Sequence, residues 1–241
     1  MTSLPRSDLK THTCYRLGIR TSIFDGDFAE VVGALIGDGC LCKFLSKSEG
    51  NVWRYVVAFT GPWNQDHEYY ETRIRPIIYK NFGITGYIYH RRDNDTVGYF
   101  IQSERVVKFF HELGLPLGTK GENLGIPPQI LADDELARAC IRGIFNTDGC
   151  IYRRYSKQYS NHPKHYKSYA VIQFKMKSRR LVEEIKAVLN KSGIRTTKIG
   201  EDKGCWVCRI TTQEHVDSFM KLFGITHPHH VQRYMQIREN T

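Results

Sequence analysis

Two kinds of hydrophobic pattern alternate along this chain, and they alternate in the same order twice. Apolar residues three or four positions apart predict one helix that runs through Gly37 and another that runs through Thr147. We expect Asp27 and Asp134 to cap the starts of these two helices. After each helix the period shortens to two, which is typical of strands with one buried face.

The remaining elements recur in the same order in both parts of the chain. Each part has a strand-like run, an amphipathic helix, a hairpin with turn residues at its centre and a closing helix. These elements fall at 53–59, 68–82, 86–102 and 103–114 in the first part, and at 169–174, 179–192, 195–211 and 212–224 in the second. Pro76 predicts a kink or break in the first amphipathic helix. The pattern therefore predicts an α+β fold of two similar α-β-β-α-β-β-α units.

A constant offset relates the two units. Asp38 and Asp148 are 110 residues apart (148 − 38), and the same offset places Gly114 on Gly224. Such agreement far from the anchor favours an internal repeat over chance. We divide the chain into an N-terminal extension (1–25), a first half (26–120), a linker with Pro and Gly (121–134) and a second half (135–241).

The most specific feature of the repeat is a pair of short strings, VVGALIGDGC at 31–40 and IRGIFNTDGC at 141–150. Each string has a glycine near its start, Gly33 or Gly143. A helix position without a side chain lets two backbones approach closely. We therefore expect the two helices to pack against each other.

Both strings end in Asp-Gly-Cys, which places a carboxylate at the end of each helix. The carbonyl end of a helix is already partly negative, so Asp38 and Asp148 are in an unfavourable position. If the helices pack, the two carboxylates arrive together and repel each other. A bound divalent cation reverses this penalty, and hard oxygen ligands favour a magnesium-like ion over zinc.

The charge of the chain narrows the choice of partner. Among its 241 residues there are 35 Lys and Arg against 25 Asp and Glu, a net charge of +10 that favours a polyanion. The start has no apolar core of a secretory signal, and no apolar run approaches the roughly 20 residues that span a bilayer. We expect no membrane partner and an intracellular protein, cytoplasmic if prokaryotic, or organellar.

Positive charge is concentrated between 151 and 182, where nine Lys and Arg, interleaved with tyrosines, occur without any Asp or Glu. A basic and aromatic segment with strand character suits phosphates, and a β-ribbon fits the major groove of DNA. The candidate DNA-binding residues are Arg54, Tyr87, Tyr89, Arg91 and Tyr99 in the first half, and Arg153, Arg154, Lys157, Tyr159, Gln173, Lys175, Arg195, Thr197 and Arg209 in the second.

Residues 31–39 and 141–149 resemble the LAGLIDADG motif, because they keep its glycine and its final Asp-Gly. They depart from it at the sixth position, Ile36 and Asn146. Over roughly residues 26–235 the chain resembles the single-chain, two-motif LAGLIDADG homing endonucleases. The resemblance implies pseudo-symmetric halves packed through the motif helices, with two curved antiparallel sheets that form a saddle over double-stranded DNA.

The resemblance also implies a metal-dependent hydrolysis of phosphodiester bonds. In this family the final Asp of each motif binds the metals, here Asp38 and Asp148, helped by the carbonyls of the preceding residues, Gly37 and Thr147. Two carboxylates with divalent ions can activate water and stabilise the leaving oxygen. We expect Mg²⁺ as the cofactor, with Ca²⁺ supporting binding without cleavage, and short 3′ overhangs as the product.

The same family places a lysine after the last helix of each half. In the first half this residue is Lys120, and the 110-residue register places His230 opposite it. The imidazole would orient water or a phosphate, with a partial charge near neutral pH. We therefore take Lys120 and His230 as the two candidate basic residues of the site.

The function that these features predict is that of a site-specific DNA endonuclease, encoded by a mobile intron, that acts as a monomer on a long, weakly palindromic site. A group I intron RNA maturase and a non-catalytic DNA-binding regulator on the same scaffold are the alternatives. The presence of both Asp38 and Asp148 favours the nuclease, because a pure binder does not need like charges there. An intein is disfavoured, since MTSLP and QIRENT lack splicing residues.

Overall fold

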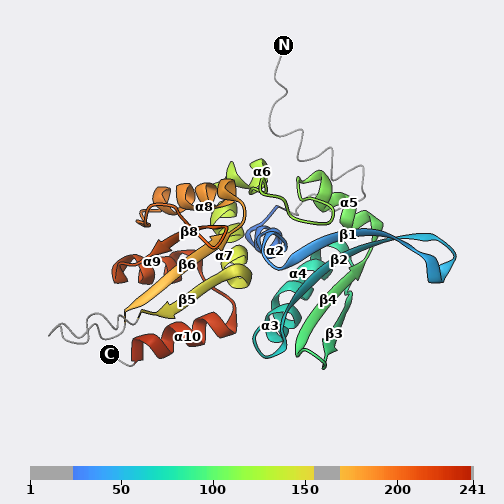
Figure 1. Ribbon diagram of the computed structural model, residues 1–241, viewed down its shortest axis with the longest axis horizontal. Coiled ribbons are helices and arrows are strands. Elements are labelled where there is room, and N and C mark those ends of the chain that lie inside the picture. The colour runs from blue at the N-terminus through green and yellow to red at the C-terminus, as the bar shows by residue number, and fades with distance from the viewer. Residues whose placement is uncertain (1–23, 155–168, 240–241) are drawn as a thin grey trace, which may run out of the picture.

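The computed structural model of this protein describes residues 24–154 and 169–239. The candidates Lys157 and Tyr159 lie outside the described residues. Two helices, α2 and α7, lie side by side at the centre of the molecule, with one sheet on each side of them (Figure 1). None of the helices in the described part of the chain has the length and apolar character that a membrane span requires.

The element order repeats, as the sequence predicts. The first part contains α2 (Gly26–Ile36), β1 (Gly39–Ser46), η1 (Lys47–Glu49), β2 (Val52–Pro62), α3 (Trp63–Tyr69), η2 (Tyr70–Ile74), α4 (Arg75–Phe82), β3 (Tyr87–Arg91), β4 (Thr96–Gln102) and α5 (Glu104–Glu112). After the short α6 (Pro128–Leu131), the second part contains α7 (Asp134–Asp148), β5 (Gly149–Arg153), β6 (Ala170–Met176), α8 (Arg179–Lys191), β7 (Gly200–Asp202), β8 (Cys205–Ile210), α9 (Gln213–Phe223) and α10 (Pro228–Glu239).

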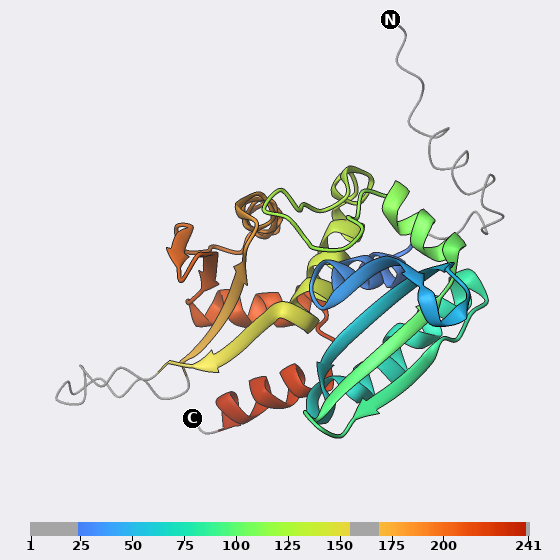
Figure 2. The same ribbon diagram turned by 45° about the vertical axis from the view of Figure 1, so that its right-hand side comes forward.

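The two sheets have the same antiparallel topology. Their strand orders are β1-β2-β4-β3 and β5-β6-β8-β7, so the second sheet repeats the first strand by strand. Helices cover one face of each sheet, and alternate strand residues such as Val57, Phe59, Ile172 and Phe174 are buried beneath them. Figure 2 shows the first sheet in front of its helices. The predicted α+β fold of two similar units packed through α2 and α7 is confirmed.

The two central helices touch backbone to backbone at the predicted glycines. A Cβ atom added to Gly33 would lie 1.9 Å from the carbonyl oxygen of Cys140, and one added to Gly143 would lie 2.0 Å from that of Glu30. Real side chains do not tolerate such contacts with a helix backbone. The glycines are therefore what allows α2 and α7 to bring their C-terminal ends together.

We expect Gly143→Ala to lower the free energy of unfolding by about 2–3 kcal/mol, because the added methyl forces the two buried helices apart. Urea unfolding followed by circular dichroism measures this effect. Gly121→Ala is the matched control, because a Cβ there meets nothing within 4 Å, and it should leave the midpoint unchanged. Equal stability of the two variants would show that the close approach of α2 and α7 is dispensable.

Two local predictions need correction. The caps of α2 and α7 are Asp25 and Asp133, not Asp27 and Asp134, because these earlier side chains accept hydrogen bonds from the first-turn amides. The predicted amphipathic helix is interrupted by the π-helical turn η2, and Pro76 lies directly after this turn, at the start of α4. This interruption agrees with the kink or break predicted at Pro76.

The second half also differs from the first in ways that the pattern does not predict. The strand β7 is only three residues long, although residues 195–199 read as a strand. A further helix, α10, follows directly after α9 and packs against β5 and α3. It takes the place of the loop that carries Lys120 in the first half.

Candidate active site

The four predicted metal ligands lie together where the central helices end. Gly37 is the C-cap of α2, Asp38 follows it in a turn, and Asp148 is the last residue of α7. A Cβ on Gly37 would lie 1.9 Å from the Thr147 hydroxyl and 3.5 Å from the Asp148 carboxyl carbon. The two halves of the site are thus in contact, and a single ligand can reach both.

The surroundings of Asp38 and Asp148 disfavour the ionised form of both carboxyl groups. Burial, with the nearby charges of Asp148 and Asp66, raises the pKa of Asp38 to about 7. Burial also raises the pKa of Asp148, against the opposing charge of Lys120. The Tyr70 hydroxyl donates a hydrogen bond to Asp38 Oδ2 at 3.1 Å and fixes its orientation. Paired carboxylates with raised pKa values in one site are typical of a functional centre.

The loop after α5 brings Lys120 to this pair of carboxylates. The Gly118 amide donates to the Leu41 carbonyl at 2.7 Å, which ties the loop to the start of β1. The Lys120 ammonium donates to the Gly37 carbonyl. Burial lowers the pKa of Lys120, while the charges of Asp148 and Asp38 oppose this change. The predicted basic residue of the first half is therefore in place.

The donor chemistry of the site fits a hard divalent cation. Two carboxylates and the Gly37 carbonyl supply oxygen only, and the Lys120 ammonium at that carbonyl shows that a positive charge is accommodated there. Residues 24–154 and 169–239 contain no group of three or more His, Cys, Asp or Glu side chains able to hold a metal. The remaining ligands would therefore have to be carbonyls, water or oxygens of a bound substrate.

His230 does not occupy the position that the sequence register predicts. It is buried in α10, with its ring 4.8 Å from that of Phe145 and 5.1 Å from that of His227. Burial, with the neighbouring histidines, lowers its pKa to about 3, so the ring is neutral at physiological pH. The 110-residue offset does not hold here because the second half has the helix α10 where the first half has the Lys120 loop. This helix directs the His230 side chain into the core. His230 is therefore not a catalytic candidate.

Sequence reasoning missed a buried pair beside Asp38 that joins the two halves. The Nε2 atom of His227 lies 3.0 Å from Oδ1 of Asp66, and both side chains are almost completely buried. Asp66 comes from α3 and His227 from the turn before α10. The missing side chain of Gly61 leaves room for Asp66 Oδ2, which would lie 1.7 Å from an added Cβ. The only signal in the sequence was the His-rich string around 227–230.

The open face of the first sheet carries most of its predicted DNA contacts. Tyr87, Tyr89 and Arg91 alternate along β3 and are exposed. Arg54 shares this face and pairs with Glu49 at 2.6 Å. Tyr99 does not belong to the face: it is buried, and its hydroxyl donates to the Thr85 carbonyl. The strand register, Tyr87 opposite Phe100, places Tyr99 on the helix-covered side.

The open face of the second sheet, which none of the described helices covers, carries a row of hydrogen-bonded polar side chains. The Arg209 guanidinium donates to the Gln173 side-chain oxygen across β6 and β8 at 2.7 Å, and the Arg209 backbone amide donates to the Thr197 hydroxyl. Lys175 pairs with Asp202 at 2.9 Å on the same face. Arg195 is exposed and lies in the segment before β7.

Arg153 ends β5 and Arg154 follows it, and because successive residues of an extended chain point to opposite faces, their side chains lie in different environments. Arg154 directly follows β5 and is exposed. Arg153 lies on the helix-covered face, opposite Ala170, and its guanidinium donates to the Ile237 carbonyl of α10. Arg153 is therefore removed from the set of predicted DNA contacts, as is Tyr99.

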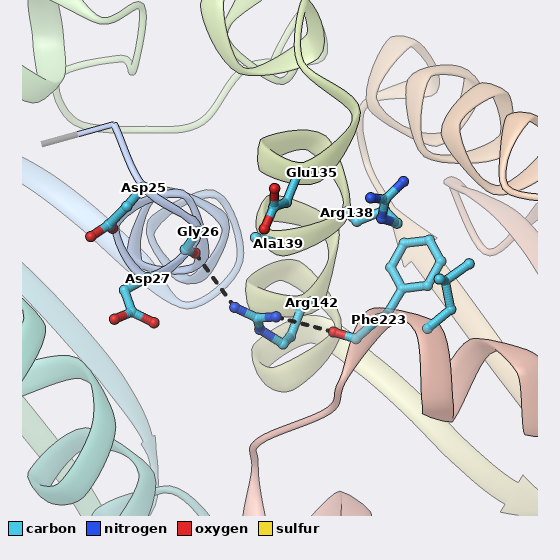
Figure 3. Close-up of a pocket in the computed structure, with 9 residues that line it drawn as sticks. Asp25, Gly26, Asp27, Glu135, Arg138, Ala139, Arg142 and Phe223 are labelled. Atoms are coloured by element: carbon cyan, nitrogen blue, oxygen red, sulfur yellow. Dashed lines mark hydrogen bonds between the residues drawn. The ribbon is translucent and has the colours of Figure 1, made fainter. Parts of the chain in front are cut away.

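A cavity of about 470 Å³ lies at the other end of the central helices, around Gly26, Arg138 and Phe223. In Figure 3 the Arg142 guanidinium bridges the carbonyls of Gly26 and Phe223 across this space. The cavity is lined by the start of α2, so it lies a whole helix length from Asp38 and Asp148. It is not part of the acidic site.

Known proteins share both the motif and the architecture. Residues 135–224 match the family model described as a LAGLIDADG-like domain. No curated protein sequence matches the chain. The sequence resemblance to LAGLIDADG proteins is thus confirmed for the second half by the family model, independently of the whole fold.

Solved structures extend the likeness to the whole fold. Variants of the homing endonuclease I-DmoI match with a TM-score of 0.58 and 20% identity, over 82% of this chain and 88% of theirs. I-DmoI in complex with DNA and Mn gives the same score and identity, over 84% and 98%. A variant of I-SmaMI matches with a TM-score of 0.61 and 14% identity, over 88% and 89%. The chain therefore has the fold of the two-motif LAGLIDADG homing endonucleases.

Proposed function

We propose that this protein is a site-specific, metal-dependent DNA endonuclease. The observation that carries the proposal is that Asp38 and Asp148, one from each pseudo-symmetric half, lie together at the C-terminal ends of two helices. The partly negative carbonyl end of a helix disfavours an ionised carboxylate there. Two sheets with polar open faces flank this point. Duplex DNA has two strands of opposite direction, so a two-fold arrangement of halves can meet each strand with the same device.

The side chains divide the work of phosphodiester hydrolysis. Asp38 and Asp148 would hold the divalent ions, which supply Lewis acidity and lower the pKa of bound water. Tyr70 orients the Asp38 carboxylate. Lys120 places a positive charge next to both carboxylates, where it can stabilise the charge that develops on a scissile phosphate. The tyrosines and arginines of the open sheet faces would position the duplex.

The finer parts of the proposal rest on the family resemblance and the charge of +10. They are Mg²⁺ as the physiological ion, action as a monomer on a long, weakly palindromic site, short 3′ overhangs, an intron origin and an intracellular location. Residues 26–120 and 135–241 would act as the two half-site modules, joined by 121–134. The DNA complex of I-DmoI, with its similar fold, supports DNA as the substrate.

Selection from a randomised duplex library tests this proposal. Protein in Ca²⁺ should retain one long site, and Mg²⁺ should then cut both strands at that site. Sequencing of the ends gives the overhang. Asp148→Asn should still select the same site but reduce cleavage by on the order of 1,000-fold or more, because it removes a shared metal ligand.

The other outcomes identify the alternative functions. Tight selection without any cut in Mg²⁺ or Mn²⁺ would contradict the nuclease and support a DNA-binding regulator. Failure to select any duplex, together with binding of a structured RNA, would support the maturase. Undiminished cleavage by Asp148→Asn would show that the chemistry lies elsewhere in the protein.

A further inference from the structure

The open faces of the two sheets can be compared residue by residue, because both sheets have the same register. In the first sheet the glycine that follows Asp38 pairs with Phe59. In the second sheet the glycine that follows Asp148 pairs with Phe174. Residues counted from these two phenylalanines therefore occupy matching places relative to the acidic site.

The chemistry of the two faces differs one residue before each phenylalanine, at Ala58 and Gln173. Ala58 pairs with Phe100 of β4, and Gln173 pairs with Arg209 of β8. All four side chains are partly exposed on the open face, because their neighbours along the strands are buried on the helix-covered face. The second half thus has a polar pair at the place where the first half has an apolar pair.

The Arg209 guanidinium is held in one orientation by its neighbours. Its Nε atom donates to the Gln173 side-chain oxygen at 2.7 Å. The Arg209 amide donates to the Thr197 hydroxyl at 3.0 Å, and the Arg209 carbonyl accepts from the Thr197 amide at 2.8 Å. Within residues 24–154 and 169–239, the two terminal nitrogens of the guanidinium donate no hydrogen bond. They are therefore available to a ligand in a geometry that is already fixed.

The place of Arg209 in the sheet favours a base over a phosphate as this ligand. Its strand, β8, is an inner strand of the order β5-β6-β8-β7. When a sheet lies in the major groove, its inner strands face the base edges and its outer strands face the phosphates. Guanine displays two neighbouring acceptors there, N7 and O6, which a guanidinium can bind with two N–H groups at once.

The matching place in the first sheet cannot make this contact. Phe100 and Ala58 carry no side-chain donor or acceptor. The Phe100 ring lies over Gly98, where an added Cβ would clash with it, and the Tyr87 ring flanks it at a centroid distance of 5.3 Å. Such an apolar surface fits the methyl group that thymine displays in the major groove.

We propose that Arg209, oriented by Gln173, binds a guanine in the half-site beneath the second sheet, and that Phe100 contacts a thymine methyl at the symmetry-related position of the other half-site. The target is therefore asymmetric at this position, although equivalent strands lie over both half-sites. The assignment rests on the duplex binding of the proposed function. Gln173 pairs with the residue two positions after Asp148, so the guanine belongs to the inner part of its half-site.

Base preferences of variants test the proposal. The unmodified protein and each variant select duplexes from the randomised library in Ca²⁺, and the bound pools are sequenced. Arg209→Ala should lower the preference for guanine at a single position by about 10- to 100-fold and leave the other positions unchanged. Arg209→Gln should change the preferred base at that position from guanine to adenine. Phe100→Ala should lose the preference for thymine at the symmetry-related position.

Arg179→Ala is the matched control. It removes an exposed arginine of α8, on the helix-covered side of the same sheet, where the guanidinium pairs with Glu183 and lies over the Trp206 ring. This variant should select the same site with the same base preferences as the unmodified protein. A change at the guanine position in Arg179→Ala would show that the preference does not come from the open face, and would overturn the assignment.

The remaining outcomes separate this assignment from the proposed function. Uniform weakening of all duplexes by Arg209→Ala, with a shallower dependence of affinity on salt, would identify a phosphate contact and overturn the assignment. Guanine at both symmetry-related positions of the selected site would overturn it as well. A selected site that is never cut in Mg²⁺ would remove the nuclease and leave the assignment standing, whereas selection of no duplex would remove both.

Discussion

Replacing Asp38 with Asn is expected to abolish cleavage of both strands and, at the same time, to stabilise the metal-free protein. The loss of activity follows because the substitution removes a proposed metal ligand at the contact of the two halves. The gain in stability follows because folding places this carboxylate in a buried site beside Asp148 and Asp66. Asn cannot ionise, yet its side-chain oxygen can still accept the Tyr70 hydroxyl.

The sign of the pH dependence follows from the direction of the shift. The pKa of Asp38 is raised from 3.8 to about 7 on folding, so the folded state holds this proton more tightly than the unfolded state. Unmodified protein therefore loses stability as the pH rises from about 4 to about 7, and the loss is complete above that range. Because Asp38 keeps some contact with water, we expect Asp38→Asn to be more stable by about 2 kcal/mol at pH 8.

Thermal unfolding in EDTA at pH 4 and pH 8 measures this difference, which should vanish at the lower pH. Adding Mg²⁺ should raise the melting temperature of the unmodified protein but not that of Asp38→Asn, because only the intact site gains binding energy. Asp93→Asn, in the exposed turn between β3 and β4, is the matched control and should change neither. A destabilised Asp38→Asn in EDTA at pH 8 would contradict this account of the site.

The parts of the site that could be predicted from sequence are those fixed by local chemistry that occurs twice. Gly33 and Gly143 predict a close helix contact, and the contact follows for any two helices that present glycine to each other. The aspartates after them then meet because their distance from the glycines is equal in both helices. These inferences need only the helix period and the repeat.

The predictions that are wrong are those that depended on how residues far apart in the sequence pair with each other. The prediction of Tyr99 as a DNA contact is wrong because the hairpin register pairs it with Ile88 on the helix-covered side, and a shift of one residue in a hairpin moves every side chain to the other face. His230 was assigned by a register that ends where α10 begins. The His227–Asp66 contact joins residues 161 positions apart, and no local pattern identifies it.

Asn146 shows how a departure from the family motif becomes intelligible only in three dimensions. Its side-chain amide donates to Glu30 Oε1 at 3.2 Å and to the Thr226 hydroxyl at 2.8 Å. Glu30 lies one residue before the first motif string, and no pattern in the sequence predicts a charged core residue there. The two residues belong to a buried polar network that crosses the interface between the halves.

We expect the loss of Glu30 to be the most damaging single change in the protein. Its side chain is completely buried and accepts six hydrogen bonds, from Tyr69, Arg73, Arg142, Asn146 and Thr226. Burial raises the pKa of Glu30, but Arg73, Arg142 and Thr226 together hold it below its ordinary value. The stability it confers is thus present above about pH 4 and is lost as the pH falls further.

Glu30→Gln leaves Arg73 and Arg142 without their shared counter-charge, and should lower the free energy of unfolding by about 3–5 kcal/mol at pH 7. Urea unfolding measures the loss, and Glu49→Gln, which removes an exposed ion pair with Arg54, should leave the midpoint nearly unchanged. In the double variant Glu30→Leu, Arg142→Leu the cost should be smaller than the sum of the single costs, because the uncompensated guanidinium is also removed. Strict additivity, or a loss below about 1 kcal/mol for Glu30→Gln, would show that the halves are held by α2 and α7 packing alone and not by this charge network.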